Sequence, residues 1–195
     1  MELRDRIMEG AITCFREKGI RFTMDDLAEK LGMSKKTIYT VFAGKDELLV
    51  AMVEHVFFSI KESENKVLWD KNLTTVEKLR KLMGVFPDAY RDINFQGVFE
   101  LREKYPEIYE IVEEKLETGW EATIALLEQG MTEGTIRKIS IPIFKTMFEA
   151  SLEQFFQRDI LQKNSISYQQ ALTEVVDILI DGVVIAPGDA GMVTK

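Results

Sequence analysis

The chain has 195 residues, of which 46% are hydrophobic and 30% are charged, and its formal net charge is −8. This length suits one ordinary domain or two small ones, and the composition excludes collagen-like repeats and wholesale disorder. No apolar run approaches the roughly 18 residues that a membrane helix needs. Because residues 1–6 include four charged side chains and lack the apolar core of a secretory signal, we expect a cytoplasmic protein with no membrane partner.

The residue types that usually carry catalysis or bind metals are scarce. Cys14 is the only cysteine and His55 the only histidine, which excludes an intramolecular disulfide and a Cys/His zinc site. Cys14 lies beside the apolar face of the first predicted helix, which favours a core residue over a redox sensor. His55 has no nucleophile or orienting acid near it in sequence. We expect no catalytic residue, no metal, no cofactor and no enzymatic activity.

Apolar spacing and end signals predict four helices in the first 60 residues. These helices cover residues 7–18, 24–31, 35–42 and 45–60. Thr23 and Ser34 are the predicted N-caps of the second and third helices. Gly19, Gly32 and Gly44 separate the four segments. The second and third helices therefore form a helix-turn-helix, whose second helix can enter the major groove of DNA.

The rest of the sequence predicts more helices and no convincing strand. Thr74 and Ser167 open capping boxes at the starts of two of them. The predicted helices cover residues 76–86, 94–104, 106–129, 141–157 and 168–184, and residues 186–191 form a frayed tail. The sequence thus predicts an all-α fold of about nine helices. A three-helix head over residues 1–46 precedes a helical body over residues 47–195.

Positive charge is concentrated around the third predicted helix. Residues 1–50 carry nine basic and nine acidic side chains, so the remaining chain holds the whole excess of acids. The segment 30–45 contains four lysines and no acid. The helix starts before and after the third helix contain acidic residues, whereas residues 34–37 read Ser-Lys-Lys-Thr. The absence of carboxylates at this one helix start favours an anionic partner.

Two runs of residues in the head resemble the N-terminal signature of the TetR/AcrR family of bacterial transcriptional regulators. The runs are Ile7-x3-Ala11-x3-Phe15-x3-Gly19 and Thr23-x3-Leu27-Ala28-x3-Gly32-Met33-Ser34-x2-Thr37-Ile38-Tyr39-x2-Phe42-x2-Lys45-x2-Leu48. Residues 50–195 resemble the family only in their helical, acidic and apolar character. The resemblance implies an all-helical homodimer with a DNA-binding head, a ligand-responsive body and last two helices that pair across the dimer.

The resemblance also implies roles for single residues of the head. The residues expected to contact phosphates are Thr37, Tyr39 and Lys45. The residues expected to reach base edges are Lys35, Lys36 and Thr40. Thr23 and Ser34 would act first as helix caps and only second as phosphate contacts. The alternative for the two adjacent lysines is a solvated helix start, and the alternative for the tyrosine is a half-buried packing ring.

Aromatic and methionine side chains are dense in the central helices of the body. The candidates for an effector pocket are Met83, Phe86, Tyr90, Phe95, Phe99, Tyr109, Trp120, Met147 and Phe148. This set is compatible with an apolar or aromatic small molecule, and equally with an ordinary helical core.

Two late helices carry broad apolar faces that could pair across a dimer. The face of the first comprises Ile143, Met147, Ala150, Leu152 and Phe155. The face of the second comprises Leu172, Val175, Val176, Leu179 and Val183. Together with their symmetry mates, two such helices would form a four-helix interface.

These inferences predict a DNA-binding transcriptional regulator. As a homodimer it would bind a palindromic double-stranded operator, in the simplest case as a repressor. An effector in the body would change the angle of the helix that begins at Lys45 and so release the DNA. The alternative is a ligand-binding or protein-interaction dimer whose head does not read DNA, and the neutral charge of residues 1–50 keeps this alternative open.

Overall fold

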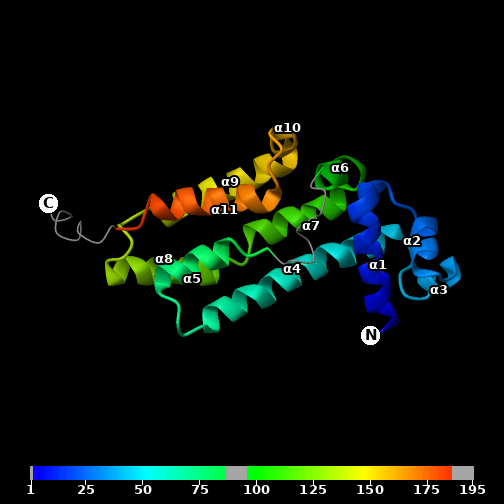
Figure 1. The fold of residues 1–195 in the computed structure, drawn as a ribbon, viewed down its shortest axis with the longest axis horizontal. Helices are drawn as coiled ribbons and strands as arrows, with labels where there is room; N and C mark the ends of the chain where they lie inside the picture. Colours follow the sequence, from blue (N-terminus) through cyan, green and yellow to red (C-terminus); the bar gives the residue numbers. More distant parts are fainter. Residues whose placement is uncertain (1, 87–95, 186–195) are drawn as a thin grey trace. The chain divides into compact units, whose positions relative to one another are not determined.

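The computed structural model describes residues 2–86 and 96–185, without the side chains of residues 96–99. In these ranges every extended regular element is a helix, as predicted (Figure 1). The exception is an isolated antiparallel bridge between Ile136 and Val184. None of the helices in these ranges is long and apolar enough to cross a membrane.

The chain divides into two compact units. Unit 1 consists of Met1–Ser59 and Asp88–Lys115, and unit 2 consists of Ile60–Pro87 and Leu116–Lys195. Residues 96–115 thus pack with the N-terminal helices, although the sequence between them folds into unit 2.

Unit 1 contains the N-terminal helices and part of the middle of the chain. Its elements are α1 (Leu3–Lys18), the 3-10 helix η1 (Gly19–Arg21), α2 (Met24–Leu31), α3 (Lys35–Tyr39), the first part of α4 (Lys45–Trp69), α6 (Gln96–Lys104) and most of α7 (Pro106–Glu117). Helix α1 packs on η1 and α2, and α2 packs on α3 (Figure 1). Helix α6 packs on η1, so it lies against the segment that leads into α2.

Polar side chains begin both helices of the helix-turn-helix, as predicted. The hydroxyl of Thr23 accepts a hydrogen bond from the backbone N–H of Asp26, and the hydroxyl of Ser34 accepts one from that of Thr37. Gly32 ends α2 with φ at 61°, a left-handed conformation that glycine adopts without strain. These local signals fix the length of α2 and the start of α3.

The core of unit 1 is apolar and closely packed. Its fully buried side chains include Ile7, Ala11, Ile20, Phe22, Leu27, Ile38, Phe42 and Leu48. Gly10 allows α1 to approach α2, because a Cβ atom at this position would lie 2.6 Å from Cδ2 of Leu31. The close contact of α1 with α2 therefore depends on the missing side chain at position 10.

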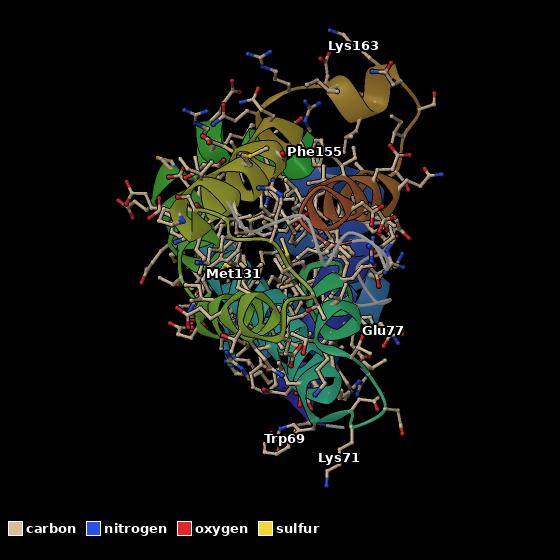
Figure 2. The ribbon with its side chains drawn as sticks, turned by 90° about the vertical axis from the view of Figure 1, so that its left-hand side faces the viewer. Trp69, Lys71, Glu77, Met131, Phe155 and Lys163 are labelled. Carbon is tan, nitrogen blue, oxygen red and sulfur yellow. The ribbon has the colours of Figure 1, made fainter. Side chains whose placement is uncertain are left out.

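Unit 2 contains the end of α4 and the later helices. These are α5 (Thr75–Met83), α8 (Glu121–Glu133), α9 (Ile141–Gln157), α10 (Ile160–Lys163) and α11 (Tyr168–Asp181). Helix α5 packs on α8 and α11, and α11 packs on α9, where Figure 2 places Phe155. The guanidinium of Arg80 in α5 donates to the carboxylates of Asp177 and Asp181 in α11.

The predicted helix over residues 106–129 is wrong, because two helices occupy this region. Helix α7 ends at Glu117 and α8 begins at Glu121. Between them Gly119 has φ at 80°, which does not fit a right-handed helix. The prediction failed because apolar residues recur with helical spacing on both sides of the break.

Other helix boundaries also differ from the prediction. Helix α3 ends at Tyr39 instead of residue 42, and the four-residue helix α10 was not predicted. A single turn contains too few residues to show a periodic pattern. Residues 94 and 95 of one predicted helix lie outside the described residues, as does the predicted tail.

We expect the substitution Gly10→Val to destabilise the protein by about 1–3 kcal/mol, because the added side chain would overlap Leu31 in the contact between α1 and α2. Thermal or urea unfolding followed by circular dichroism measures this change. The control is Glu9→Val, which places the same side chain at an exposed position of α1. Equal stability of the two variants would contradict the close packing of α1 on α2.

Candidate nucleic-acid interface

The short helix α3 presents one buried and one exposed side. Ile38 is completely buried, whereas Tyr39 has 46% of its surface exposed. Lys35, Lys36 and Thr40 are also exposed, and Thr37 is half-buried. The structure thus brings the predicted contacts of α3 together on one accessible surface, which we call the α3 face and define as Lys35, Lys36, Thr37, Tyr39 and Thr40.

Local hydrogen bonds hold the polar groups at the start and end of α3. The hydroxyls of Ser34 and Thr37 lie 2.9 Å apart, within hydrogen-bonding distance. The hydroxyl of Thr40 donates to the carbonyl of Thr37 at 2.6 Å. Ser34 therefore acts as a cap, and its hydroxyl remains exposed at the edge of the α3 face.

The two lysines of the α3 face differ in their surroundings. Lys35 forms an ion pair with Asp25 of α2, with 2.8 Å between Nζ and Oδ1, and this hydrogen-bonded carboxylate raises the pKa of Lys35. For Lys36, by contrast, the described residues provide no ion pair. The ammonium of Lys36 can approach an anion directly, whereas that of Lys35 must first leave Asp25.

Thr23 is occupied by its capping role. Its backbone N–H donates to Oδ2 of Asp26 at 2.7 Å, and its hydroxyl donates to the same oxygen at 2.8 Å. Lys18 also binds this carboxylate, and together these bonds lower the pKa of Asp26 to about 2. The Thr23 hydroxyl therefore lies next to a negative charge, which makes it a poor partner for phosphate.

The predicted phosphate contact Lys45 points into unit 1. Its ammonium donates to the backbone carbonyl of Ile20 and lies 4.7 Å from the ring centre of Phe22 and 5.8 Å from that of Tyr105. Burial lowers the pKa of Lys45, and the positive charge of Lys104 lowers it further. The structure therefore does not place this ammonium with the α3 face.

The effector candidates are distributed over both units. Tyr90, Phe95 and the side chain of Phe99 lie outside the described residues. Tyr109 is buried in unit 1, whereas Met83, Phe86, Trp120, Met147 and Phe148 belong to unit 2. The described candidates therefore belong to two separate units.

One candidate pair lies at the break between α7 and α8. Trp120 and Phe148 form an edge-to-face contact with 5.6 Å between ring centres. The ammonium of Lys145 lies 5.6 Å from the ring centre of Trp120 and donates to the carbonyl of Glu117 at 2.9 Å. Lys145 also pairs with Glu149, at 3.4 Å between Nζ and Oε1, so these two buried rings adjoin an ion pair.

A second aromatic cluster surrounds Tyr168, which the sequence analysis did not single out. The Phe86 ring lies 5.0 Å from the Tyr168 ring, and Phe156 stacks on it at 5.7 Å. Phe155 contacts it edge-on at 6.4 Å. Tyr168 directly follows the cap Ser167, so it was interpreted only as the start of a helix.

Half of the residues predicted for the dimer interface belong to the core of unit 2 instead. The residues buried there are Leu152, Leu172, Val176, Leu179 and Val183. Those predictions were wrong because both sides of α9 and α11 are apolar. Ile143 and Met147 are 61% and 54% exposed, and Ile178, which was not predicted, is 71% exposed.

Comparison with known proteins connects the helix-turn-helix to a family. Residues 7–52 match the family model described as bacterial regulatory proteins, tetR family. The matched segment contains most of α1, all of α2 and α3, and the beginning of α4. The match therefore falls on the helices that position the α3 face.

Individual relatives agree with this assignment. YvaF of Bacillus subtilis, an uncharacterised HTH-type transcriptional regulator, is 27% identical over 178 residues, which cover 91% of this chain and 94% of YvaF. IcaR of Staphylococcus aureus, a negative transcriptional regulator of the biofilm operon icaADBC, is 26% identical over 108 residues, which cover 55% of this chain and 52% of IcaR.

A solved structure shares the fold across both units. It is the transcriptional regulator FadR from Bacillus subtilis in complex with stearoyl-CoA, with a TM-score of 0.67, 17% identity, and coverage of 91% of this chain and 98% of FadR. At this identity the likeness concerns the fold alone. The family match over residues 7–52 identifies the helix-turn-helix as one of the tetR family of bacterial regulatory proteins, and the near full-length similarity to YvaF supports a TetR-type transcriptional regulator.

Proposed function

We propose that the protein binds a palindromic operator as a homodimer, represses transcription, and is released by a small-molecule effector. The observation that carries this proposal is the exposed α3 face, in which Lys36 and Tyr39 extend from a helix anchored by the buried Ile38. The negative regulator IcaR supports repression as the outcome of binding. FadR, crystallised with stearoyl-CoA, supports a fold that accepts apolar ligands.

On DNA the α3 face would divide its contacts between bases and backbone. The ammonium of Lys36 can donate to O6 and N7 of guanine, and the exposed hydroxyl of Tyr39 can donate to a phosphate oxygen. In a homodimer the two α3 helices would enter successive major grooves about 34–36 Å apart. The operator would then consist of two half-sites related by the dimer axis.

Few positive charges would take part in this binding. Lys35 is paired with Asp25, and Lys45 is turned into unit 1, so Lys36 is the lysine that the α3 face offers directly. The logarithm of the binding constant falls linearly with the logarithm of the salt concentration, and each neutralised phosphate adds about 0.9 to the steepness of this fall, which we call the salt slope. We therefore propose that operator affinity depends only weakly on salt. Base contacts and groove fit would then provide a large share of the affinity.

The effector would bind in unit 2 near aromatic side chains. The buried pair of Trp120 and Phe148 supplies aromatic side chains, and the ion pair of Lys145 with Glu149 adjoins it. Aromatic side chains suit an apolar or aromatic molecule, and an anionic end on it would replace Glu149 as the partner of Lys145. Release of the DNA requires that this molecule bind more tightly to the form of the dimer that does not fit the operator.

The dimer interface would use the exposed apolar residues of α9 and α11. Ile143 and Met147 lie one helical turn apart on α9, and Ile178 lies on the adjacent α11. Ala150, also exposed, extends the α9 side by another turn. A second copy of the chain can cover this surface by placing the same two helices against it.

We expect Lys36→Met to weaken operator binding at least about tenfold and to reduce the preference for the operator over random DNA, because the variant loses the ammonium that donates to guanine. The measurement is a titration with salt of the protein's binding to two DNAs of equal length. One comes from the region upstream of the gene that encodes this protein, and the other has a random sequence. The wild-type protein should prefer the upstream DNA.

The matched control is Lys71→Met, because Lys71 is exposed in unit 2 and Figure 2 shows it pointing outward. This variant should bind like the wild type. If the wild type binds both DNAs equally and weakly, selection from a random-sequence pool follows. Failure to enrich any sequence would refute DNA recognition and favour the ligand-binding or protein-interaction dimer.

We expect the double substitution Ile143→Asp, Met147→Asp to raise the dimer dissociation constant at least about 100-fold. Each dimer would contain two copies of both residues, and burial of such a side chain contributes roughly 1.5–3 kcal/mol. Sedimentation equilibrium over a range of concentrations measures the constant. As a control, Phe58→Asp changes a side chain of α4 that is 61% exposed and should leave dimerisation unaffected.

A further inference from the structure

The ammonium of Lys45 occupies an interior position in unit 1. It donates to the carbonyl of Ile20 in η1 and lies over the ring of Phe22, which is completely buried. On another side it lies 5.8 Å from the ring centre of Tyr105, between α6 and α7. One ammonium therefore contacts two separate segments of the same unit, residues 20–22 and Tyr105.

These contacts compensate for lost hydration. An ammonium that leaves water needs hydrogen-bond acceptors or other negative potential around it. The Ile20 carbonyl supplies an acceptor, and the faces of the two aromatic rings supply negative potential. The lowered pKa of Lys45 agrees with this environment, since burial is its largest cause.

The segment that Lys45 holds leads directly into the helix-turn-helix. Ile20 and Phe22 precede Thr23, the N-cap of α2, and Lys45 itself follows the turn after α3. Lys45 therefore connects the entrance of the helix-turn-helix to its exit. The orientation of α3 depends on both of these connections.

A second polar contact joins the same segment to α6. The guanidinium of Arg21 donates to both carboxylate oxygens of Glu100, at 3.2 Å from Nε and at 2.9 Å from a terminal nitrogen. Lys104 pairs with the same carboxylate at 3.4 Å. The loop between α1 and α2 is thus fixed from two directions, by Lys45 of α4 and by Glu100 of α6.

We propose that Lys45 is a positioning residue of the DNA-binding head, and that its ammonium holds the entrance of α2 against α4 and Tyr105 instead of contacting a phosphate. This inference rests on the proposed DNA-binding function. A phosphate contact would require the ammonium to leave the Ile20 carbonyl and both rings. The new bond would then replace existing bonds and add little to the affinity.

The test compares Lys45→Met with Lys36→Met in the full-length protein. Methionine keeps an unbranched apolar side chain at position 45 and removes the ammonium. Three quantities are measured for each variant: the melting temperature, the affinity for the operator and for random DNA, and the salt slope of operator binding. DNA binding is measured well below the melting temperature, so that both variants are folded.

For Lys45→Met we expect a melting temperature lower by roughly 3–8 °C, because the Ile20 carbonyl loses its partner. We expect operator affinity to fall about tenfold, since α3 is no longer held in its orientation. Affinity for random DNA and the salt slope should stay at their wild-type values. A residue with a merely structural role would lower the melting temperature without this selective loss of operator affinity.

Lys36→Met should also lower operator affinity, but with an unchanged melting temperature, because its exposed ammonium contacts bases and supports no part of unit 1. A fall of about 0.9 in the salt slope of Lys45→Met would overturn the inference, because it would reveal a phosphate contact. An unchanged melting temperature of Lys45→Met would also overturn it. If the wild type binds no DNA at all, the proposed function fails, and the melting temperature alone decides whether Lys45 anchors unit 1.

A second variant tests the contact with Tyr105. Tyr105→Leu removes the aromatic face and should lower operator affinity selectively, by less than Lys45→Met does. Combined with Lys45→Met it should cause little further loss, because both substitutions break the same contact. Additive losses in operator affinity would show that the two residues act independently and would contradict the proposed anchor.

Discussion

The buried contact of α3 with the core of unit 1 determines what the protein can present to DNA. A helix of five residues has no stability of its own, so its orientation depends on the side chains that it buries. Ile38 and Phe42, both completely buried, hold it in place. The remaining side chains of α3 must then face outward, and their chemistry becomes the chemistry of the surface.

In this acidic chain the partner of each lysine matters more than its position in sequence. The segment 30–45 contains four lysines, but Lys30 pairs with Glu17, Lys35 pairs with Asp25, and Lys45 binds a carbonyl. Their charges are partly or wholly compensated inside the protein. A lysine-rich segment is therefore a poor measure of the charge available to DNA, because long-range pairing removes part of it.

The elements that the sequence predicts well are those encoded by adjacent residues. The caps Thr23 and Ser34 and the left-handed Gly32 lie within a few residues of the helix ends that they determine. The break at Gly119 was missed, since apolar spacing continues past it and its backbone conformation is visible only in the fold. For the same reason the sequence did not reveal that α6 packs on η1.

The sequence also does not show which apolar side chains point into the core on a helix with two apolar sides. Helix α9 buries Leu152 and exposes Met147, although both are apolar and both were assigned to one interface. Composition alone cannot say which apolar stripe faces the protein's own core. The same limit applies to Lys45. Its position in the family signature suggests a contact with DNA, but Ile20, Phe22 and Tyr105 set the direction of its side chain.

Helix α4 is held by similar bonds in each unit. In unit 1 the ammonium of Lys45 donates to the carbonyl of Ile20, and in unit 2 the ammonium of Lys61 donates to the carbonyl of Gly119 at 2.9 Å. Gly119 adjoins Trp120, a proposed effector contact. A ligand that shifts the backbone at Gly119 would therefore break the bond to Lys61, draw the Lys61 side chain after it, or move α4 with it. Such a ligand acts on α4 only through its different affinities for the two arrangements, so tight binding without that difference would leave the head unchanged.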